Sequence, residues 1–234
     1  MALLRAADEA IGASDARTIR YGGVDGYVTA IGQSYSPQIS DGWPRFHLQS
    51  FTRTIDFENM SMREEQVRTQ GQWPAEIGGG LRPIIGERRT IANYMDGHAW
   101  NKNPDGSVTP SPRNATVRML EIIMTPHGFI RHAMQADDLR MDTRWESFRS
   151  TNREYTVSFT WHGPKGDYPI TGWIDEDHHV QKVQTWFPSP VVGDQFVETR
   201  YAQWEDYDGF AFGPEVHQSV GTPPHPSYDF HATD

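Results

Sequence analysis

The second half of the chain is a run of short extended segments separated by turns, and this regular spacing limits the fold more than any other feature of the sequence. The segments cover residues 154–162, 168–175, 180–187, 195–204 and 210–220. Glycine, proline and aspartate are frequent in the turns between them, and these residues favour the backbone angles of tight turns. Extended segments joined by short turns pair as antiparallel neighbours. The pattern predicts a β-meander.

Longer extended segments occupy the first half of the chain, at residues 18–31, 45–58 and 62–70. Only a few residues separate the last two segments, which predicts that they pair as a long hairpin. A short helix is expected at residues 2–11, where apolar residues recur at helical spacing and Gly12 ends the pattern.

Clear helical signals are concentrated in residues 114–135. Asn114 can cap a first helix, and Thr125 with the proline after it is typical of a second helix start. The sequence therefore predicts an α+β fold, mainly antiparallel β, with a helical pair and a short N-terminal helix. We expect residues 1–221 to form a single β-rich domain and the proline-containing residues 222–234 to form a tail or linker.

Composition argues against several classes of function. The formal net charge of −10 opposes binding to the phosphate backbone of nucleic acids. The chain has no cysteine, which excludes disulfides, cysteine-ligated zinc and a thiol nucleophile. No apolar run approaches the length of a membrane span. We expect a soluble protein that is not membrane-spanning and binds no nucleic acid. It is cytoplasmic as the sequence stands, and periplasmic or secreted if a signal peptide has been removed.

Motifs for self-sufficient catalysis are missing from the sequence. There is no Gly-x-Ser-x-Gly nucleophile elbow, and no His-x-His-x-Asp-His or His-Glu-x-x-His string that would bind a metal. His47 and His127 are the candidate general bases, because an imidazole titrates near neutral pH. We predict no metal site and no cofactor in this chain.

Charged residues gather on the predicted long hairpin. If its strands pair, one patch of the sheet holds Arg53, Asp56, Glu65, Arg68 and Gln70. Charged side chains within a strand are costly unless they are paired or exposed. The patch is then either a salt-bridge ladder on an open face or a polar anchor for a ligand at one end of an apolar cavity. In the second interpretation, the candidate wall residues are Trp43, His47, Trp161, Trp173 and Trp186.

Three phrases of the sequence, in order, resemble a known family. They are WPRFHLQSFTRTIDFENMSMREEQVRTQG at residues 43–71, MTPHGFIRHAM at residues 124–134, and GWIDEDHHVQKVQTWFPSPVVGDQFVETRYAQWEDYDGFAF at residues 172–212. Together they resemble the N-terminal accessory domain that precedes the catalytic domain in a group of bacterial metallo-β-lactamase-fold hydrolases. The phrases belong to the framework of that domain and include no catalytic motif.

The resemblance implies a more specific fold. It implies an open curved sheet or half-barrel with the helical pair packed on its concave face, similar to the lipoprotein-carrier folds that hold acyl chains. It also implies that zinc belongs to a following domain, if one exists, and that this chain binds none. His47 departs from the family pattern, which has an acidic or polar residue there.

Three functional hypotheses remain open. The first is a non-catalytic binding or scaffolding domain. Its partner would be a small apolar or amphipathic molecule, a second copy of the chain, or a metallo-β-lactamase-fold hydrolase domain. The second is a free-standing enzyme without a metal, in which His47 or His127 acts as general base and Arg53 or Arg68 binds an anion. The third is a metal-dependent enzyme that uses histidines near the C-terminus.

Overall fold

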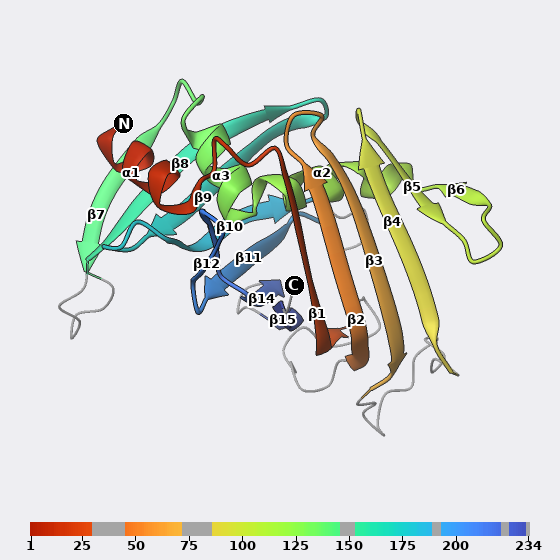
Figure 1. Cartoon of the computed structure of the whole chain (residues 1–234). Helices are drawn as coiled ribbons and strands as arrows, with labels where there is room; N and C mark the ends of the chain where they lie inside the picture. The colour runs from red at the N-terminus through yellow and green to blue at the C-terminus, as the bar shows by residue number, and fades with distance from the viewer. Residues whose placement is uncertain (30–44, 72–85, 146–152, 189–192, 221–224, 233–234) are drawn as a thin grey trace.

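An antiparallel sheet of thirteen strands curves around two helices (Figure 1). The computed structural model describes residues 1–29, 45–71, 86–145, 153–188, 193–220 and 225–232. The strand order is β6-β5-β4-β3-β2-β1-β15-β14-β11-β10-β9-β8-β7. The two outermost strands, β6 and β7, do not pair with each other, so the sheet stays open. The predicted fold class is confirmed.

The strands of the first half of the sheet meander from its centre to one edge and become shorter toward that edge. They are β1 (Thr18–Thr29), β2 (Arg45–Asp56), β3 (Ser61–Gln70), β4 (Arg88–Met95), β5 (His98–Lys102) and β6 (Val108–Pro110).

The second half returns from the opposite edge toward the centre. Its strands are β7 (Arg140–Trp145), β8 (Arg153–Gly163), β9 (Gly166–Ile174), β10 (Val180–Phe187), β11 (Gln195–Ala202), β14 (Glu215–Val220) and β15 (His225–Ala232). A separate two-stranded hairpin is formed by β12 (Glu205–Tyr207) and β13 (Phe210–Phe212).

The helices lie on the inner side of the curved sheet (Figure 1). They are α1 (Ala2–Ile11), a 3₁₀ turn η2 (Pro112–Asn114), α2 (Ala115–Ile123) and α3 (Pro126–Ala133). Within the described residues, no helix is long and apolar enough to cross a membrane.

The predicted break between α2 and α3 is present, and the N-cap of α3 explains where the second helix begins. Thr125 is the N-cap of α3, and its hydroxyl accepts a hydrogen bond from the Gly128 amide over 3.1 Å. This bond satisfies one of the amides that a helix start leaves unpaired. The new direction of α3 brings the fully buried Phe129 against Phe159 of β8 and onto Gly172 of β9.

A bulge in β2 interrupts the simple alternation of its side chains. Leu48 pairs with Arg68 and Ser50 with Val67, so Gln49 is an extra residue in β2. A bulge of one residue reverses which side chains point to which face. Phe46 and Leu48 are therefore buried on the same face as Arg53, whereas simple alternation predicts opposite faces.

The prediction of a C-terminal tail is also corrected. Residues His225–Ala232 form β15, which pairs with β14 on one side and with β1 on the other. β15 therefore lies at the centre of the sheet, between β1 and β14 (Figure 1). Prolines suggested a linker, but an X-Pro segment prefers an extended backbone and is compatible with a strand at positions whose amide is not needed.

Candidate functional site

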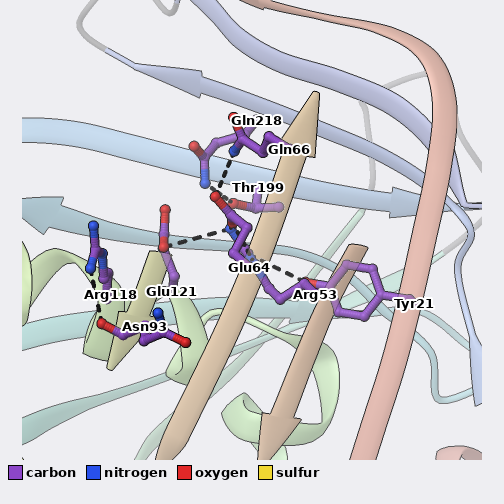
Figure 2. Close-up of polar contacts among 9 residues, drawn as sticks. All are labelled: Tyr21, Arg53, Glu64, Gln66, Asn93, Arg118, Glu121, Thr199 and Gln218. Carbon is purple, nitrogen blue, oxygen red and sulfur yellow. Dashed lines mark hydrogen bonds and ion pairs between the residues drawn. The ribbon is translucent and has the colours of Figure 1, made fainter. Parts of the chain in front are cut away.

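A buried cluster of charges joins the sheet to α2 (Figure 2). Arg53 lies on β2, directly opposite Glu64 of β3. Arg53 Nε donates a hydrogen bond to Glu64 Oε2 over 2.9 Å, and Arg53 Nη2 also donates to this oxygen. Arg53 Nη2 lies 3.6 Å from Oε2 of Glu121, which projects from α2. The side chains of Arg53, Glu64 and Glu121 are 10%, 11% and 15% exposed, respectively. These charges therefore interact in a region that is largely shielded from water.

Two further side chains tie the cluster to neighbouring elements. Arg53 Nη1 donates to the hydroxyl of Tyr21 on β1 over 3.3 Å, and the side-chain amide of Gln66 donates to Glu64. Hydrogen bonds of this kind satisfy buried polar atoms that would otherwise be costly.

Arg118, one turn before Glu121 on α2, is directed toward the outer strands. It donates to the backbone oxygens of Asn93 and Trp100 over 2.9 Å each, and to the side chain of Asn101. It therefore fastens α2 to β4 and β5 and is engaged away from Glu121.

Burial is the largest influence on the pKa of Glu121. Loss of water around its carboxyl raises the pKa to about 7, while Arg53 opposes the rise and Glu64 adds to it. Arg118 opposes the rise more weakly. A buried carboxyl near a second carboxylate favours its neutral form. Glu121 therefore titrates close to neutral pH, which is unusual for a glutamate.

A small cavity of about 20 Å³ opens beside the cluster. Its lining comes from four strands and α2 and consists of Tyr21, Arg53, Glu121, Met124, Thr199, Tyr201, Val216 and Gln218. We call it the Glu121 cavity. The volume is close to the minimum that holds one water molecule.

A larger, half-open pocket of about 230 Å³ lies between the start of β1 and the β12–β13 hairpin. We call it the hairpin pocket. Its lining is mostly aromatic and consists of Thr18, Ile19, Arg20, Tyr21, His127, Tyr207, Phe210 and Phe212. β15 pairs with β1 only between Gly23 and Val28. Among the described strands, the start of β1 is therefore paired on its β2 side alone, which leaves space next to the hairpin.

Tyr21 belongs to the walls of both cavities. Its ring packs against Phe212 with a centroid distance of 4.9 Å, and its hydroxyl binds Arg53. One side chain therefore separates an apolar pocket from a charged cluster.

His127 lies at the bottom of the hairpin pocket and is 1% exposed. Its Nε2 lies 3.0 Å from the backbone oxygen of Ile11, and its ring stacks between Phe57 and Phe212. Burial lowers the pKa of His127 to about 4, with Arg131 adding to the effect. The ring is therefore neutral at physiological pH and acts as a donor to Ile11.

The two predicted general bases are not brought together. His47 lies on the sheet face opposite to Phe46 and Leu48, and its side chain is 41% exposed. Its Nε2 is 3.4 Å from Asp25 and its Nδ1 is 3.5 Å from the Thr69 hydroxyl. His47 lines none of the cavities described above, whereas His127 lines the hairpin pocket.

The residues of the predicted charged patch separate onto two faces of the sheet. Arg53 is in the buried cluster, while Glu65 points to the other face and forms ion pairs with Arg63 and Arg89. Arg68 donates to Thr90 over 3.3 Å and its guanidinium lies over the Phe46 ring. Gln70 is exposed at the end of β3, opposite Phe46.

The tryptophans that were predicted to line one cavity lie at separate places in the fold. Trp43 lies outside the described residues. Trp161 packs near Tyr168 and His132, Trp173 is buried under Lys182, and Trp186 is exposed beside Phe196. None of these three lines the Glu121 cavity or the hairpin pocket.

Sequence reasoning missed Glu64, Glu121 and Tyr21. Glu64 could have been found, because the register of a short hairpin turn places it opposite Arg53, one residue before the predicted Glu65. Glu121 and Arg118 are the two charged residues of a helix that is otherwise mostly apolar, and a lone carboxylate in such a helix is a signal of a buried partner.

Within the described residues, no group of three or more histidine, aspartate or glutamate side chains is placed to hold a metal ion. The side chains of His225 and His231 lie outside the described part, so the metal-dependent hypothesis stays untested for them.

Comparisons with known proteins show similarity of fold. No protein-family model matches the chain, and a search of the curated proteins finds no matching sequence. A crystal structure of a LolA superfamily protein from Nitrosomonas europaea is similar, with a TM-score of 0.50 and 12% sequence identity. The match covers 100% of this chain and 90% of that chain. It supports the open, half-barrel fold that the resemblance implies, and the association with metallo-β-lactamase-fold hydrolases stays a prediction. The chain has a LolA-like fold.

Proposed function

We propose that this chain is a non-catalytic binding domain that holds a small amphipathic molecule in the hairpin pocket. The observation that carries the proposal is the pocket itself, a half-open space of about 230 Å³ with mostly aromatic walls. Binding sites for small molecules are typically concave and apolar, with a few polar groups that orient the ligand. A LolA-like fold, an open sheet around helices, supports a binding role.

The pocket is apolar inside and polar at its rim. Tyr21, His127 and Phe212 are buried, whereas Thr18, Arg20 and Tyr207 are exposed. The Tyr207 hydroxyl donates to Glu205 over 3.2 Å. A ligand with an apolar body and a polar end would match this gradient, because its polar end would stay in contact with water and the rim.

The size of the pocket limits the ligand. A water molecule takes up ~30 Å³ of liquid, so a space of about 230 Å³ has room for roughly eight non-hydrogen atoms. Molecules with a chain of six to eight carbons, or with one aromatic ring, are therefore suitable probes.

No feature of the described residues favours the rival hypothesis of a metal-independent enzyme. Arg53 is held by Glu64 and Glu121, and His127 is engaged with Ile11. His47 is on the opposite face of the sheet. The predicted base and the predicted anion anchor therefore have different surroundings and share no cavity.

The family resemblance adds a second expectation about partners. Association with a metallo-β-lactamase-fold hydrolase domain, or with a second copy of the chain, rests on the three sequence phrases alone. We propose it as a scaffolding role that is compatible with ligand binding.

NMR titration with 1-octanol, octanoate and toluene tests the binding proposal. We expect at least one probe to shift the amide signals of residues 18–21 and 207–212. Phe210→Ala should weaken binding roughly tenfold, because aromatic anchors dominate binding energy. Trp186→Ala is the matched control, since Trp186 is an exposed aromatic residue that does not line the pocket. Shifts elsewhere only, or equal binding by both variants, would refute the proposal.

A further inference from the structure

We infer that the ligand of the hairpin pocket is a short extended peptide, which adds to the free edge of β1 and places an apolar side chain between the aromatic walls. This inference rests on the proposed function, because it names the class of amphipathic molecule that the same pocket takes. The observation behind it is the unused backbone edge of β1, which forms one wall of the pocket.

Four consecutive residues of β1, from Thr18 to Tyr21, line the pocket. Ile19 and Tyr21 face the core, whereas Thr18 and Arg20 are exposed on the other face of the sheet. Side chains of a strand alternate between its faces, so no single face presents all four residues. The pocket therefore meets β1 along its edge, where the backbone N–H and C=O groups lie.

The hydrogen bonds between β1 and β2 fix which backbone groups point to this edge. The Phe57 amide donates to the Arg17 backbone oxygen over 3.0 Å, and this pair continues the register of the β1–β2 ladder. Bonded and non-bonded pairs alternate along an antiparallel ladder. The pair that contains Ile19 is therefore bonded, and the N–H and C=O groups of Thr18 and Arg20 point away from β2 toward the pocket.

No neighbouring strand uses these groups within the described part of the chain. β15 pairs with β1 only between Gly23 and Val28, and no hydrogen bond from another described residue reaches the outward backbone groups of Thr18 or Arg20. An unpaired strand edge is a template for a further strand. Peptides bind such edges through main-chain hydrogen bonds, and pockets beside the edge select alternate side chains.

An antiparallel peptide in this position has a defined geometry. Its central residue lies opposite Ile19 and projects its side chain to the core face, where the Tyr21 ring packs on Phe212. The carbonyl of the preceding residue accepts from the Arg20 amide, and the amide of the following residue donates to the Thr18 carbonyl. The edge and the aromatic walls thus recognise one residue together.

The size of the pocket agrees with one such residue. A space of about 230 Å³ has room for roughly eight non-hydrogen atoms, judged from ~30 Å³ for a water molecule, and this is the size of a leucine residue with its backbone. The pocket is half-open, so the rest of the peptide can continue along the edge into water. A charged side chain is excluded, because it would lose water against the buried Tyr21, His127 and Phe212.

Three small ligands test the inference by NMR titration. N-acetyl-leucine N-methylamide offers both hydrogen bonds, N-acetyl-leucine methyl ester lacks the amide that donates to Thr18, and N-acetyl-glycine N-methylamide lacks the apolar side chain. The leucine methylamide should bind roughly fivefold more tightly than the ester, which is the value of one hydrogen bond. Apolar burial alone favours the ester, because an N–H group is costly to remove from water. The glycine compound should bind at least roughly tenfold more weakly than the leucine methylamide.

A proline substitution tests the backbone of β1 directly. Arg20→Pro removes the amide that faces the pocket and keeps the hydrogen bonds to β2, so both leucine ligands should bind roughly fivefold more weakly and toluene equally well. Val108→Pro is the matched control, because the Val108 amide points away from β5 at the edge of the sheet and does not line the pocket. Pro110 already occupies the equivalent position two residues later in β6. In the original protein, saturating leucine methylamide should slow hydrogen exchange of the Arg20 amide, whereas toluene should not.

Failure of the peptide assignment differs from failure of the proposed function. If toluene binds in the pocket while the ester binds as well as the leucine methylamide, the peptide assignment is wrong and the apolar site remains. The same holds if the leucine methylamide leaves exchange of the Arg20 amide unchanged. If no ligand, toluene and 1-octanol included, shifts the signals of residues 18–21 and 207–212, both proposals are wrong. The comparison of methylamide with ester requires no variant, so it decides the matter even if Arg20→Pro does not fold.

Discussion

Tyr21 and Arg53 lie directly opposite each other on β1 and β2, and Arg53 Nη1 donates a hydrogen bond to the Tyr21 hydroxyl over 3.3 Å. The same tyrosine ring packs on Phe212 in the hairpin pocket. This pair connects the apolar pocket to the charges that hold α2 against the sheet.

Arg53→Met should destabilise the fold strongly. The substitution leaves Glu64 and Glu121 buried without their guanidinium, and removal of one partner from a buried ion pair costs about 3–5 kcal/mol. The free energy of unfolding from urea denaturation measures this loss. Arg17→Met removes one partner of an exposed ion pair and should cost about 1 kcal/mol or less. Equal losses for the two variants would contradict the assignment of a buried cluster.

Glu121→Gln should change how stability depends on pH. The pKa of Glu121 is raised from 4.5 to about 7 by burial. The native state thus holds a proton that the unfolded chain loses first, and stability falls as pH rises from 4.5 to 7. The glutamine variant cannot ionise. Its advantage over the original protein should therefore grow across this window to, at most, on the order of 3 kcal/mol.

Urea denaturation of both proteins at several pH values between 4 and 8 measures the difference. Glu58→Gln is the control, because Glu58 is about half exposed. A constant difference between Glu121→Gln and the original protein over this range would show that Glu121 has no raised pKa.

His127 should have the opposite effect on stability: its contribution should decrease as the pH falls. Burial lowers the pKa of His127 from 6.5 to about 4. The unfolded chain therefore takes up a proton first, and the contribution of this group to stability is lost as pH falls from 6.5 toward 4. His127→Phe keeps an aromatic ring between Phe57 and Phe212. It should flatten the pH dependence in this window, while lowering stability overall through the lost bond to Ile11.

The slope of unfolding free energy against pH is the readout for His127→Phe. His98→Gln replaces an exposed histidine on β5 and should leave the slope unchanged. His132, whose pKa burial also lowers to about 4, retains part of the slope in every variant. An unaltered slope in His127→Phe would contradict the neutral buried imidazole.

Much of the fold was predictable because its signals are local. The turns of the meander, the Thr125 cap and the Gly12 stop each depend on a few adjacent residues. The predicted segments are present, except that residues 210–220 divide into β13 and β14, which belong to different sheets. The bulge at Gln49 and the insertion of β15 beside β1 were not predictable, because they depend on pairing between distant segments. One misplaced bulge reverses the faces of a strand.

The contacts of the site were also hard to predict, because they too join distant segments of the chain. Arg53 was singled out because a charge within a strand needs compensation, and the structure provides it. Its partner Glu121 comes from a helix about seventy residues later, and sequence spacing carries no information on such a contact. The hairpin pocket depends on the packing of Phe212 against Tyr21, which is likewise a long-range contact.

Gly172→Ala should weaken the packing of α3 on the sheet. A Cβ atom at Gly172 would lie 2.3 Å from the ring of Phe129, which is far below van der Waals distance. Overpacking of a core typically costs about 1–3 kcal/mol. Thermal or urea unfolding measures the loss. The smaller side chain of Phe129→Leu should restore part of the stability of Gly172→Ala, and additive losses in the double variant would contradict this contact.

The most direct test of the central claim is a crystal structure of the protein grown with 1-octanol. We predict that the alkyl chain lies in the hairpin pocket, against Tyr21, Phe210 and Phe212, with its hydroxyl at the rim near Thr18 and Arg20. An empty hairpin pocket at saturating 1-octanol, or octanol bound only elsewhere on the protein, would contradict the claim that this pocket is the binding site.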